Sequence, residues 1–404
     1  MIAADDSPIA RSVAALGTGA FDEDSLQQHV APLFTRHRAE SGGTVYLANH
    51  SLGRPLDATA TDLGEGLGAW YAAMGGAWDA WRAAQQSHRA RLAELMHAPR
   101  VDCVVPKTSA GQGLRAVLNA FDGSPRVVAT TAEFDSLDMI LREYARRGRI
   151  RVEWVPTRAD GSFASEDLVA AARGGCDLVV ASEVLFASGQ RLDDMPAIVA
   201  AAHSVGAKLL LDIYHSLGAF DVDVARLGVD YAVGGSYKYL RGGPGACFLY
   251  VAPTLLDAGV TTLDIGWFAK PQPLAFAGRD NGPAAAGGDG WLESTPPVLT
   301  YYQARAGQQL LLALGIERIR AHSLQLQRRL VAHLAAYAIE ARGGEAMRGA
   351  FVVVHDARAA QWAQALARLG IAVDARGPWL RICPDLLTTE ADLKAVATAL
   401  AGLR

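Results

Sequence analysis

The sequence predicts an α/β protein with a large, mostly parallel sheet of seven strands and a smaller C-terminal α/β lobe. Seven short apolar runs alternate with helical patterns, which implies βαβ units and a parallel sheet covered on both faces. The chain has 404 residues, of which 50% are hydrophobic and 20% charged. This is enough apolar chain for a large core with an additional lobe, and it excludes disorder as the main state.

The seven strand candidates are short apolar segments separated by helical or turn-rich stretches. They cover residues 101–105, 126–130, 150–155, 178–182, 207–211, 231–234 and 247–251. Helices are expected between them, among others at residues 137–146, 165–173 and 195–205.

The N-terminal part of the chain precedes these strands. A short strand is predicted at residues 44–47, and it leads into a turn-rich loop at residues 48–55. Trp70, Trp78 and Trp81 follow in a helical region. We expect these tryptophans to pack in the core or in an interface, because large aromatic side chains are mostly buried.

The C-terminal part begins with a loop-rich segment at residues 260–300, which contains clusters of Gly, Pro and Ala. A long helix is predicted at residues 301–338, followed by a small lobe at residues 350–404. We therefore expect three parts. They are an N-terminal segment at residues 1–45 that belongs to the small domain, a large domain at residues 46–300, and the long helix with the small domain at residues 301–404.

Charge and cysteine content limit the possible partners. The formal net charge is −4 and no basic run occurs, so the electrostatic footprint of a nucleic-acid-binding protein is missing. The four cysteines are far apart with no CxxC pair, which argues against a disulfide scaffold or a metal site and fits a reducing cytosol. Neither a signal peptide nor an apolar span is predicted, so we expect a cytoplasmic protein that is not in a membrane.

Candidate catalytic residues follow two of the predicted strands, at the edge where open α/β sheets bind ligands. Asp212 ends an apolar strand, and a partly desolvated carboxylate there needs a cation or serves as a helix cap. Lys238 lies between Tyr237 and Tyr239, just before a glycine-rich loop. Such surroundings lower the pKa of an ammonium group and favour a free amine that can form a Schiff base, although a solvated surface lysine is the alternative.

A third candidate is the loop that follows the strand at residues 101–105. Thr108 and Ser109 lie there, directly before a helix, and hydroxyls with free backbone N–H groups at a helix start can bind phosphate. Pyridoxal phosphate needs a lysine for its imine, an acid beside its ring nitrogen and phosphate donors. The series Thr108–Ser109, Asp212 and Lys238 therefore predicts a pyridoxal phosphate site.

Short motifs along nearly the whole chain also carry a family resemblance. They lie at residues 46–53, 133–134, 188–189, 212–215, 236–240, 242–245, 266–268, 294–297 and 380–381. With these motifs the sequence resembles the kynureninase family, within the class V aminotransferase group of fold-type I pyridoxal phosphate enzymes. The resemblance implies a homodimer whose active sites are shared between subunits.

The resemblance implies a role for each residue around the cofactor ring. Lys238 would hold the cofactor as an imine and act as general base, Asp212 would pair with the ring nitrogen, and His215 would support that region. Phe134 would stack on the ring face. Tyr237, with Lys238 and Asp212, would complete the catalytic set.

The resemblance also implies how phosphate and substrate are bound. The phosphate contacts of this chain would be Thr108, Ser109 and the hydroxyl of Tyr237, and those of the other subunit would be Trp267, Ser294 and Thr295. The amino-acid substrate would bind through its α-carboxylate to Arg381, with His50 and Ser51 as further candidate contacts. The implied reaction cleaves the Cβ–Cγ bond of L-kynurenine, or of a related aryl-keto amino acid, to anthranilate and L-alanine.

Some residues depart from the family pattern. Leu137 stands where the family carries an Asp, so a second acid near the ring nitrogen must be Asp135 or Asp138, or be missing. An aminotransferase or a β-lyase on the same fold remains an alternative. A cysteine desulfurase is disfavoured, because residues 339–380 contain no cysteine and Cys383 is expected to be a buried hydrophobe.

Overall fold

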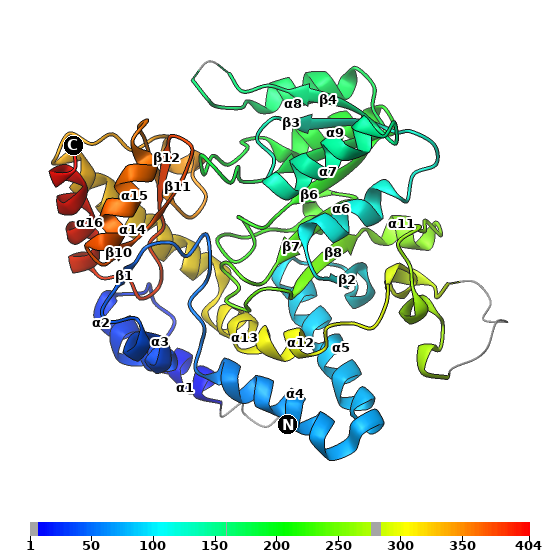
Figure 1. The fold of residues 1–404 in the computed structure, drawn as a ribbon, viewed down its shortest axis with the longest axis horizontal. Helices are drawn as coiled ribbons and strands as arrows, with labels where there is room; N and C mark the ends of the chain where they lie inside the picture. Colours follow the sequence, from blue (N-terminus) through cyan, green and yellow to red (C-terminus); the bar gives the residue numbers. More distant parts are fainter. Residues whose placement is uncertain (1–6, 159, 276–283) are drawn as a thin grey trace.

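The computed structural model describes residues 7–158, 160–275 and 284–404, which form a large lobe and a smaller C-terminal lobe beside it (Figure 1). The large lobe is built on a seven-stranded sheet in the order β2-β8-β7-β6-β5-β3-β4. Strands β7 to β4 are parallel, and β8 runs antiparallel to both of its neighbours. The prediction of a seven-stranded, mostly parallel sheet is confirmed. The strands are β2 (Val104–Lys107), β3 (Arg126–Thr130), β4 (Arg151–Val155), β5 (Leu178–Ser182), β6 (Lys208–Asp212), β7 (Tyr231–Gly235) and β8 (Cys247–Val251).

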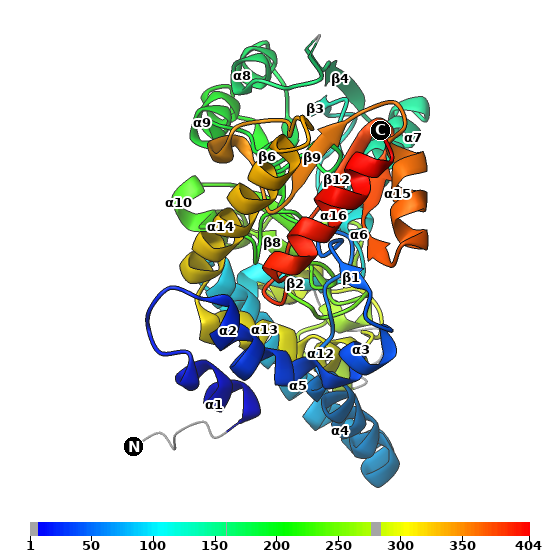
Figure 2. The ribbon, with the colours of Figure 1, turned by 90° about the vertical axis from the view of Figure 1, so that its left-hand side faces the viewer.

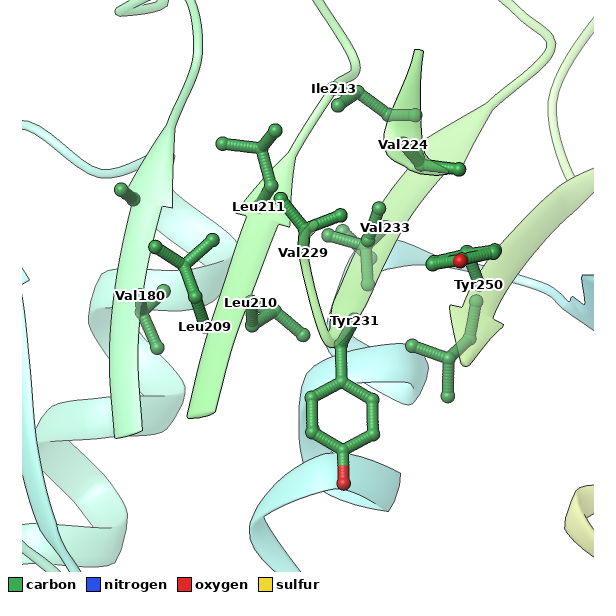
Figure 3. Packing of buried hydrophobic residues seen from close by; sticks show 14 of the residues in the cluster. Val180, Leu209, Leu210, Leu211, Ile213, Val224, Val229, Tyr231, Val233 and Tyr250 are labelled. Atoms are coloured by element: carbon green, nitrogen blue, oxygen red, sulfur yellow. The ribbon is translucent and has the colours of Figure 1, made fainter. Parts of the chain in front are cut away.

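The centre of this sheet is buried on both faces, as parallel sheets require. Every residue of β5, β7 and β8 is buried. Figure 3 shows apolar side chains of neighbouring strands, among them the register partners Val180, Leu210 and Tyr231, which lie on one face of the sheet. Helices cover the sheet, with α6 packed against α7 and α8 packed against α9. These helices are α6 (Ala110–Leu118), α7 (Asp135–Arg146), α8 (Ser165–Arg173) and α9 (Met195–Ser204), with the short α10 (Val224–Leu227) and α11 (Pro253–Asp257) further along.

The C-terminal lobe has its own core around a three-stranded antiparallel sheet in the order β11-β12-β9. The two-residue strand β1 (Val45–Tyr46), in the predicted segment 44–47, pairs in parallel with β10 (Ile371–Ala372) of this lobe. In Figure 2, α16 lies beside α14 across the lobe. The remaining elements here are β9 (Val352–His355), β11 (Asp374–Arg376), β12 (Trp379–Ile382), α15 (Ala359–Arg368) and α16 (Glu390–Gly402).

The prediction of one continuous helix at residues 301–338 was wrong. The segment forms α12 (Leu299–Gln303), α13 (Arg305–Leu314) and α14 (Ile316–Ala335). The break between α13 and α14 is Gly315, whose φ of +82° lies outside the helical region and suits a residue without a side chain. The helical periodicity of the sequence continues across this glycine, so the pattern alone did not reveal the change of direction.

The N-terminal helices and a helical hairpin complete the molecule. Helices α1 (Pro8–Ala15), α2 (Glu23–Ser25) and α3 (Thr35–Glu40) precede β1, and a third apolar cluster joins this region to α13. The hairpin of α4 (Ala58–Ala73) and α5 (Ala77–Leu95) carries the three tryptophans. Trp81 is buried and its ring lies 5.3 Å from that of Trp78, as expected, whereas Trp70 is 51% exposed. In the described part of the chain, no helix is long and apolar enough to cross a membrane.

Candidate active site

The three strand-end features predicted from the sequence surround one cavity. Asp212 ends β6, Lys238 lies in the loop after β7, and Thr108 and Ser109 lie between β2 and α6. The cavity has a volume of about 180 Å³. Its lining includes seven of the predicted site residues, namely Thr108, Ser109, Phe134, Asp212, His215, Tyr237 and Lys238.

Lys238 is almost completely buried in this cavity, with 6% of its surface exposed. Its Nζ lies 2.8 Å from Nε2 of His215 and 5.8 Å from the centre of the Phe134 ring. Burial, together with the charge of Arg381, lowers the pKa of Lys238 to about 7. A large fraction of the side chain is therefore a free amine at neutral pH, which is the form that attacks a carbonyl group.

The lysine loop is held in place by close backbone contacts. Gly53 N donates a hydrogen bond to the carbonyl oxygen of Tyr237 at 2.7 Å. A Cβ atom at Gly53 would lie only 2.0 Å from the carbonyl oxygen of Lys238, so no larger residue fits at this position. The loop at residues 48–55 is thus packed directly on the backbone of the lysine.

Asp212 is a buried carboxyl without a directly bound side-chain cation. Its Oδ1 accepts a hydrogen bond from the backbone N–H of Tyr214 at 2.8 Å, so it caps a turn, and no helix starts at this point. Burial raises the pKa of Asp212 to about 6, while the Tyr214 N–H and the charge of Lys238 act in the opposite direction. A cationic ring nitrogen in the cavity would supply the missing partner.

The phosphate-binding candidates form the start of α6. Ser109 is the N-cap, and its Oγ accepts a hydrogen bond from the backbone N–H of Gln112. Thr108 donates both its backbone N–H and its hydroxyl to Oε1 of Gln112, at 2.7 and 3.0 Å. Gln112 Nε2 in turn donates to Glu293, which is also paired with the buried Lys107 at 2.6 Å. The positive end of α6 suits an anion, and Thr108 would have to turn its donors from Gln112 toward the anion to bind it.

Three predicted cofactor contacts lie outside this cavity. Ser294 and Thr295 are exposed and line a neighbouring cavity together with Thr108. Trp267 donates from Nε1 to Oγ1 of Thr295 at 3.1 Å, which ties the segments around residues 267 and 295 together. Their predicted contact with a phosphate group of another subunit stays a prediction.

Arg381 lies on β12 with its guanidinium group fully engaged by protein groups. Nε donates to Asp374 Oδ1 at 2.7 Å, Nη2 donates to the other oxygen of Asp374, and Nη1 donates to the carbonyl oxygen of Phe186. Asp374 is the antiparallel partner of Arg381 in the β11–β12 register, so the sheet places the two side chains together. Asp374 could not be identified from the sequence alone, because its pairing with Arg381 becomes visible only once the strand register is known.

His50 is the second partner of Asp374. Its Nε2 lies 2.8 Å from Oδ1 of Asp374, and its ring is fully buried against Phe351 at 4.7 Å. Burial, opposed by Asp374, lowers the pKa of His50 to about 4, so the imidazole is neutral at pH 7. Ser51 is half-buried in the following turn and is not part of the cavity lining.

The structure also bears on the open question of a second acid. Asp135 is exposed at the start of α7, and Asp138 is paired with Arg142 at 2.8 Å. The carboxyl that is buried near Asp212 is instead Glu133, which in the sequence stood out only as part of a family motif.

In the described residues, no cluster of three or more His, Cys, Asp or Glu side chains is arranged to hold a metal ion.

The fold and this strand-end site define the class of the protein. The structure has the fold of the fold-type I pyridoxal phosphate enzymes. It is similar, with a TM-score of 0.80 and 20% identity, to a C-DES mutant with glycine linked to its PLP cofactor, covering 91% of this chain and 98% of that one. The cysteine desulfurase CsdA from Escherichia coli matches with a TM-score of 0.77 and 18% identity, over 94% of this chain and 98% of that chain.

The chain belongs to the aminotransferase class-V family, whose pattern matches residues 75–393. Membership of this family implies pyridoxal phosphate as the cofactor, as the sequence predicted. A kynureninase from Deinococcus radiodurans is 32% identical over 61% of this chain, and the match spans 58% of that relative. A kynureninase from Pseudomonas fluorescens is 29% identical over 74% of this chain and 72% of the relative. An uncharacterized aminotransferase, YcbU from Bacillus subtilis, is 27% identical over 76% of this chain and 80% of the relative.

Proposed function

We propose that this protein is a pyridoxal phosphate-dependent hydrolase of the kynureninase type. It would cleave the Cβ–Cγ bond of L-kynurenine, or of a related aryl-keto amino acid, to give anthranilate and L-alanine. The observation that carries the proposal is the cavity in which the free amine of Lys238 and the carboxyl of Asp212 lie at adjoining strand ends. The kynureninases among its relatives support the choice of reaction.

The residues around the cavity fit the cofactor. Asp212 would accept a hydrogen bond from the ring nitrogen, Phe134 would stack on the ring, and Thr108 and Ser109 would bind the phosphate at the start of α6. Bound through an imine to an amino acid, pyridoxal phosphate withdraws electrons from the bonds around the α carbon. Lys238 would be the covalent attachment point.

The same residues would handle the protons of the reaction. The amine of Lys238 would take the α-proton of the bound substrate. His215 is buried, and its pKa is lowered well below its usual value by burial and by Lys238, so it stays neutral. Its Nε2 lies within hydrogen-bond distance of Nζ, at 2.8 Å. A neutral imidazole at this position orients the amine without competing with it for a positive charge.

Arg381 would bind the substrate carboxylate. Its bidentate contact with Asp374 already shows the geometry in which the guanidinium group holds a carboxylate. The substrate carboxylate would share or replace one of these contacts, while Asp374 and His50 keep the side chain oriented.

We also propose that the protein is a cytoplasmic homodimer, to which Trp267, Ser294 and Thr295 contribute across the subunit interface. The exposed position of Ser294 and Thr295, outside the cavity of their own chain, supports this arrangement. The compartment rests on the cysteine pattern of the sequence.

The proposed function is tested by adding L-kynurenine to the pyridoxal phosphate-loaded protein while anthranilate fluorescence and alanine are measured. We expect stoichiometric release of both products, and none from Lys238→Ala. A loaded protein that is inert towards kynurenine and 3-hydroxykynurenine would contradict the substrate assignment.

A second candidate function is transamination, favoured by the match to the Bacillus subtilis aminotransferase. In that case the amino group would stay on the cofactor and a keto acid would be released without alanine. The same assay separates the two reactions, because only the hydrolase forms anthranilate and alanine together.

A further inference from the structure

Glu133 is a buried carboxyl beside the site that has no part in the reaction described above. It lies in the turn between β3 and α7, directly before Phe134, and only 3% of it is exposed. Thr130 Oγ1 donates to its Oε1 at 2.6 Å, and Ser182 Oγ donates to its Oε2 at 2.6 Å. Both carboxyl oxygens are therefore held by hydroxyl groups from the ends of two different strands.

These contacts connect Glu133 to Asp212. Ser182 is the last residue of β5 and is the direct register partner of Asp212 at the end of β6. Burial raises the pKa of Glu133 to about 7, and the charge of Asp212 contributes to this rise. Within the described part of the chain, no Lys, Arg or His side chain forms an ion pair with Glu133. Glu133 and Asp212 are thus two buried carboxyls that influence each other's charge.

We propose that Glu133 is a positioning residue of this site, acting as the second acid behind the cofactor ring and anchoring the turn that carries Phe134. The proposal rests on the roles proposed above for Asp212 and Phe134, but not on the identity of the substrate. Glu133 would act through Asp212 and Ser182, without touching the substrate. It would supply the second acid, for which the sequence left Asp135, Asp138 or no residue at all as alternatives.

The electrostatic consequence follows from the charges around the pair. The other titratable groups that interact with Asp212 are Lys238, Tyr214 and Tyr237. His215 is neutral and contacts Lys238. An ionised Glu133 adds negative charge behind Asp212 and favours every protonated form in the cavity, including a protonated Schiff base at Lys238. Removal of this charge must therefore lower the pKa of that Schiff base.

The test is a pH titration of the visible absorption of the pyridoxal phosphate-loaded protein, without substrate. For Glu133→Gln, which keeps the size of the side chain, we expect the apparent pKa of the chromophore to fall by about 1 unit. The matched control is Glu183→Gln. Glu183 is also fully buried with a pKa raised by burial to about 7. Its backbone N–H donates to the carbonyl oxygen of Asp212 at 3.0 Å, but the groups that act on its carboxyl are Ser216, Arg191 and Asp221.

The proposal is supported if Glu133→Gln shifts the titration while Glu183→Gln does not. It is overturned if Glu133→Gln titrates like the unmodified protein, or if both variants shift equally. If Glu133→Gln fails to fold, as judged by its circular dichroism melting curve, the same pH titration of Ser182→Ala tests the proposal. That variant removes one donor to Glu133 and favours its neutral form, so a smaller shift in the same direction is expected and an unchanged titration overturns the proposal. Failure of the protein to cleave kynurenine would leave this result unaffected.

Discussion

At the scale of single residues, burial favours the uncharged form of both Lys238 and Asp212. It lowers the pKa of Lys238 to about 7 and raises that of Asp212 to about 6. The identity of both residues and their positions at strand ends could be predicted from the sequence. Gln112, Glu133 and Asp374 were missed or undervalued, because their importance comes from contacts with residues far away in the chain.

The lowered pKa of Lys238 has a direct kinetic consequence for cofactor uptake. Only the free amine attacks the aldehyde, so the rate at which the apoprotein captures pyridoxal phosphate should rise with pH and level off above a midpoint near 7. Stopped-flow absorbance at a series of pH values measures this rate. A midpoint near the ordinary lysine value of 10.5 would show that the ammonium group is not destabilised.

Arg381 should affect substrate binding more than cofactor binding. Replacement by Ala removes a bidentate, charge-assisted contact, so we expect KM to rise by a factor of about 10 to 100. The dissociation constant of pyridoxal phosphate should stay nearly unchanged, because Arg381 is not among the residues lining the Lys238 cavity. Steady-state kinetics and cofactor titration provide the two values. An unchanged KM would remove Arg381 from the carboxylate site.

At the scale of elements, local patterns predicted most strands and helices, and contacts between distant segments account for the differences. The runs at residues 126–130, 178–182 and 247–251 coincide with β3, β5 and β8, since buried strands are recognisable from their continuous apolar residues. The helix break at Gly315 and the β1–β10 pairing escaped prediction. A helical pattern does not reveal a glycine that has left the helical conformation, and strand pairing between residues 45 and 371 has no local signal.

One buried ion-pair cluster joins three loops that are far apart in the sequence, and it should be important for stability. Asp385 binds Arg54 at 2.9 Å, from the loop after β1, and Arg241, from the lysine loop. Although burial opposes it, Arg241 and Arg54 hold the pKa of Asp385 well below its ordinary value. Because the folded-state pKa is depressed, this stabilisation is present above the pKa of an unfolded Asp, about 3.9, and is lost as the pH falls further.

Asp385→Asn leaves two buried arginines without a counter-charge, so we expect a loss of about 3–5 kcal/mol in the free energy of unfolding at pH 7. Urea denaturation measures this loss. The control is Asp356→Asn, which removes the charge of a partly exposed surface partner of Arg358 and should leave the denaturation midpoint nearly unchanged. Equal effects of the two substitutions would show that the buried cluster contributes no more to the free energy of unfolding than a surface ion pair does.

At the scale of the whole molecule, the sequence predicted the number of sheet strands and the division into a large and a small lobe. The strand order β2-β8-β7-β6-β5-β3-β4 could not be predicted, since it depends on which strands pair across the sheet. The site lies where the two lobes meet. Lys238 comes from the large lobe and Arg381 from the small one, and the charge of Arg381 influences the pKa of Lys238.

The proposed sharing of active sites between two subunits makes a specific prediction for mixed dimers. A subunit with Lys238→Ala lacks the attachment point for the cofactor, and a subunit with Ser294→Ala and Thr295→Ala lacks the proposed contacts to its partner's phosphate. Each variant alone should be inactive or nearly so. In a mixed dimer of the proposed arrangement, the intact Lys238 of the second subunit would face the intact Ser294 and Thr295 of the first, so one complete site would be formed.

Co-expression of the two variants with different affinity tags, followed by activity measurement, tests this arrangement. Random pairing makes half of the dimers mixed, each with one complete site of two, so the co-expressed protein should recover about a quarter of the unmodified activity. Mixed dimers isolated through both tags should recover about half. If such isolated mixed dimers stay inactive, Ser294 and Thr295 serve the site of their own chain. Ser294 and Thr295 would then have to reach the Lys238 cavity of their own chain by a movement within one subunit.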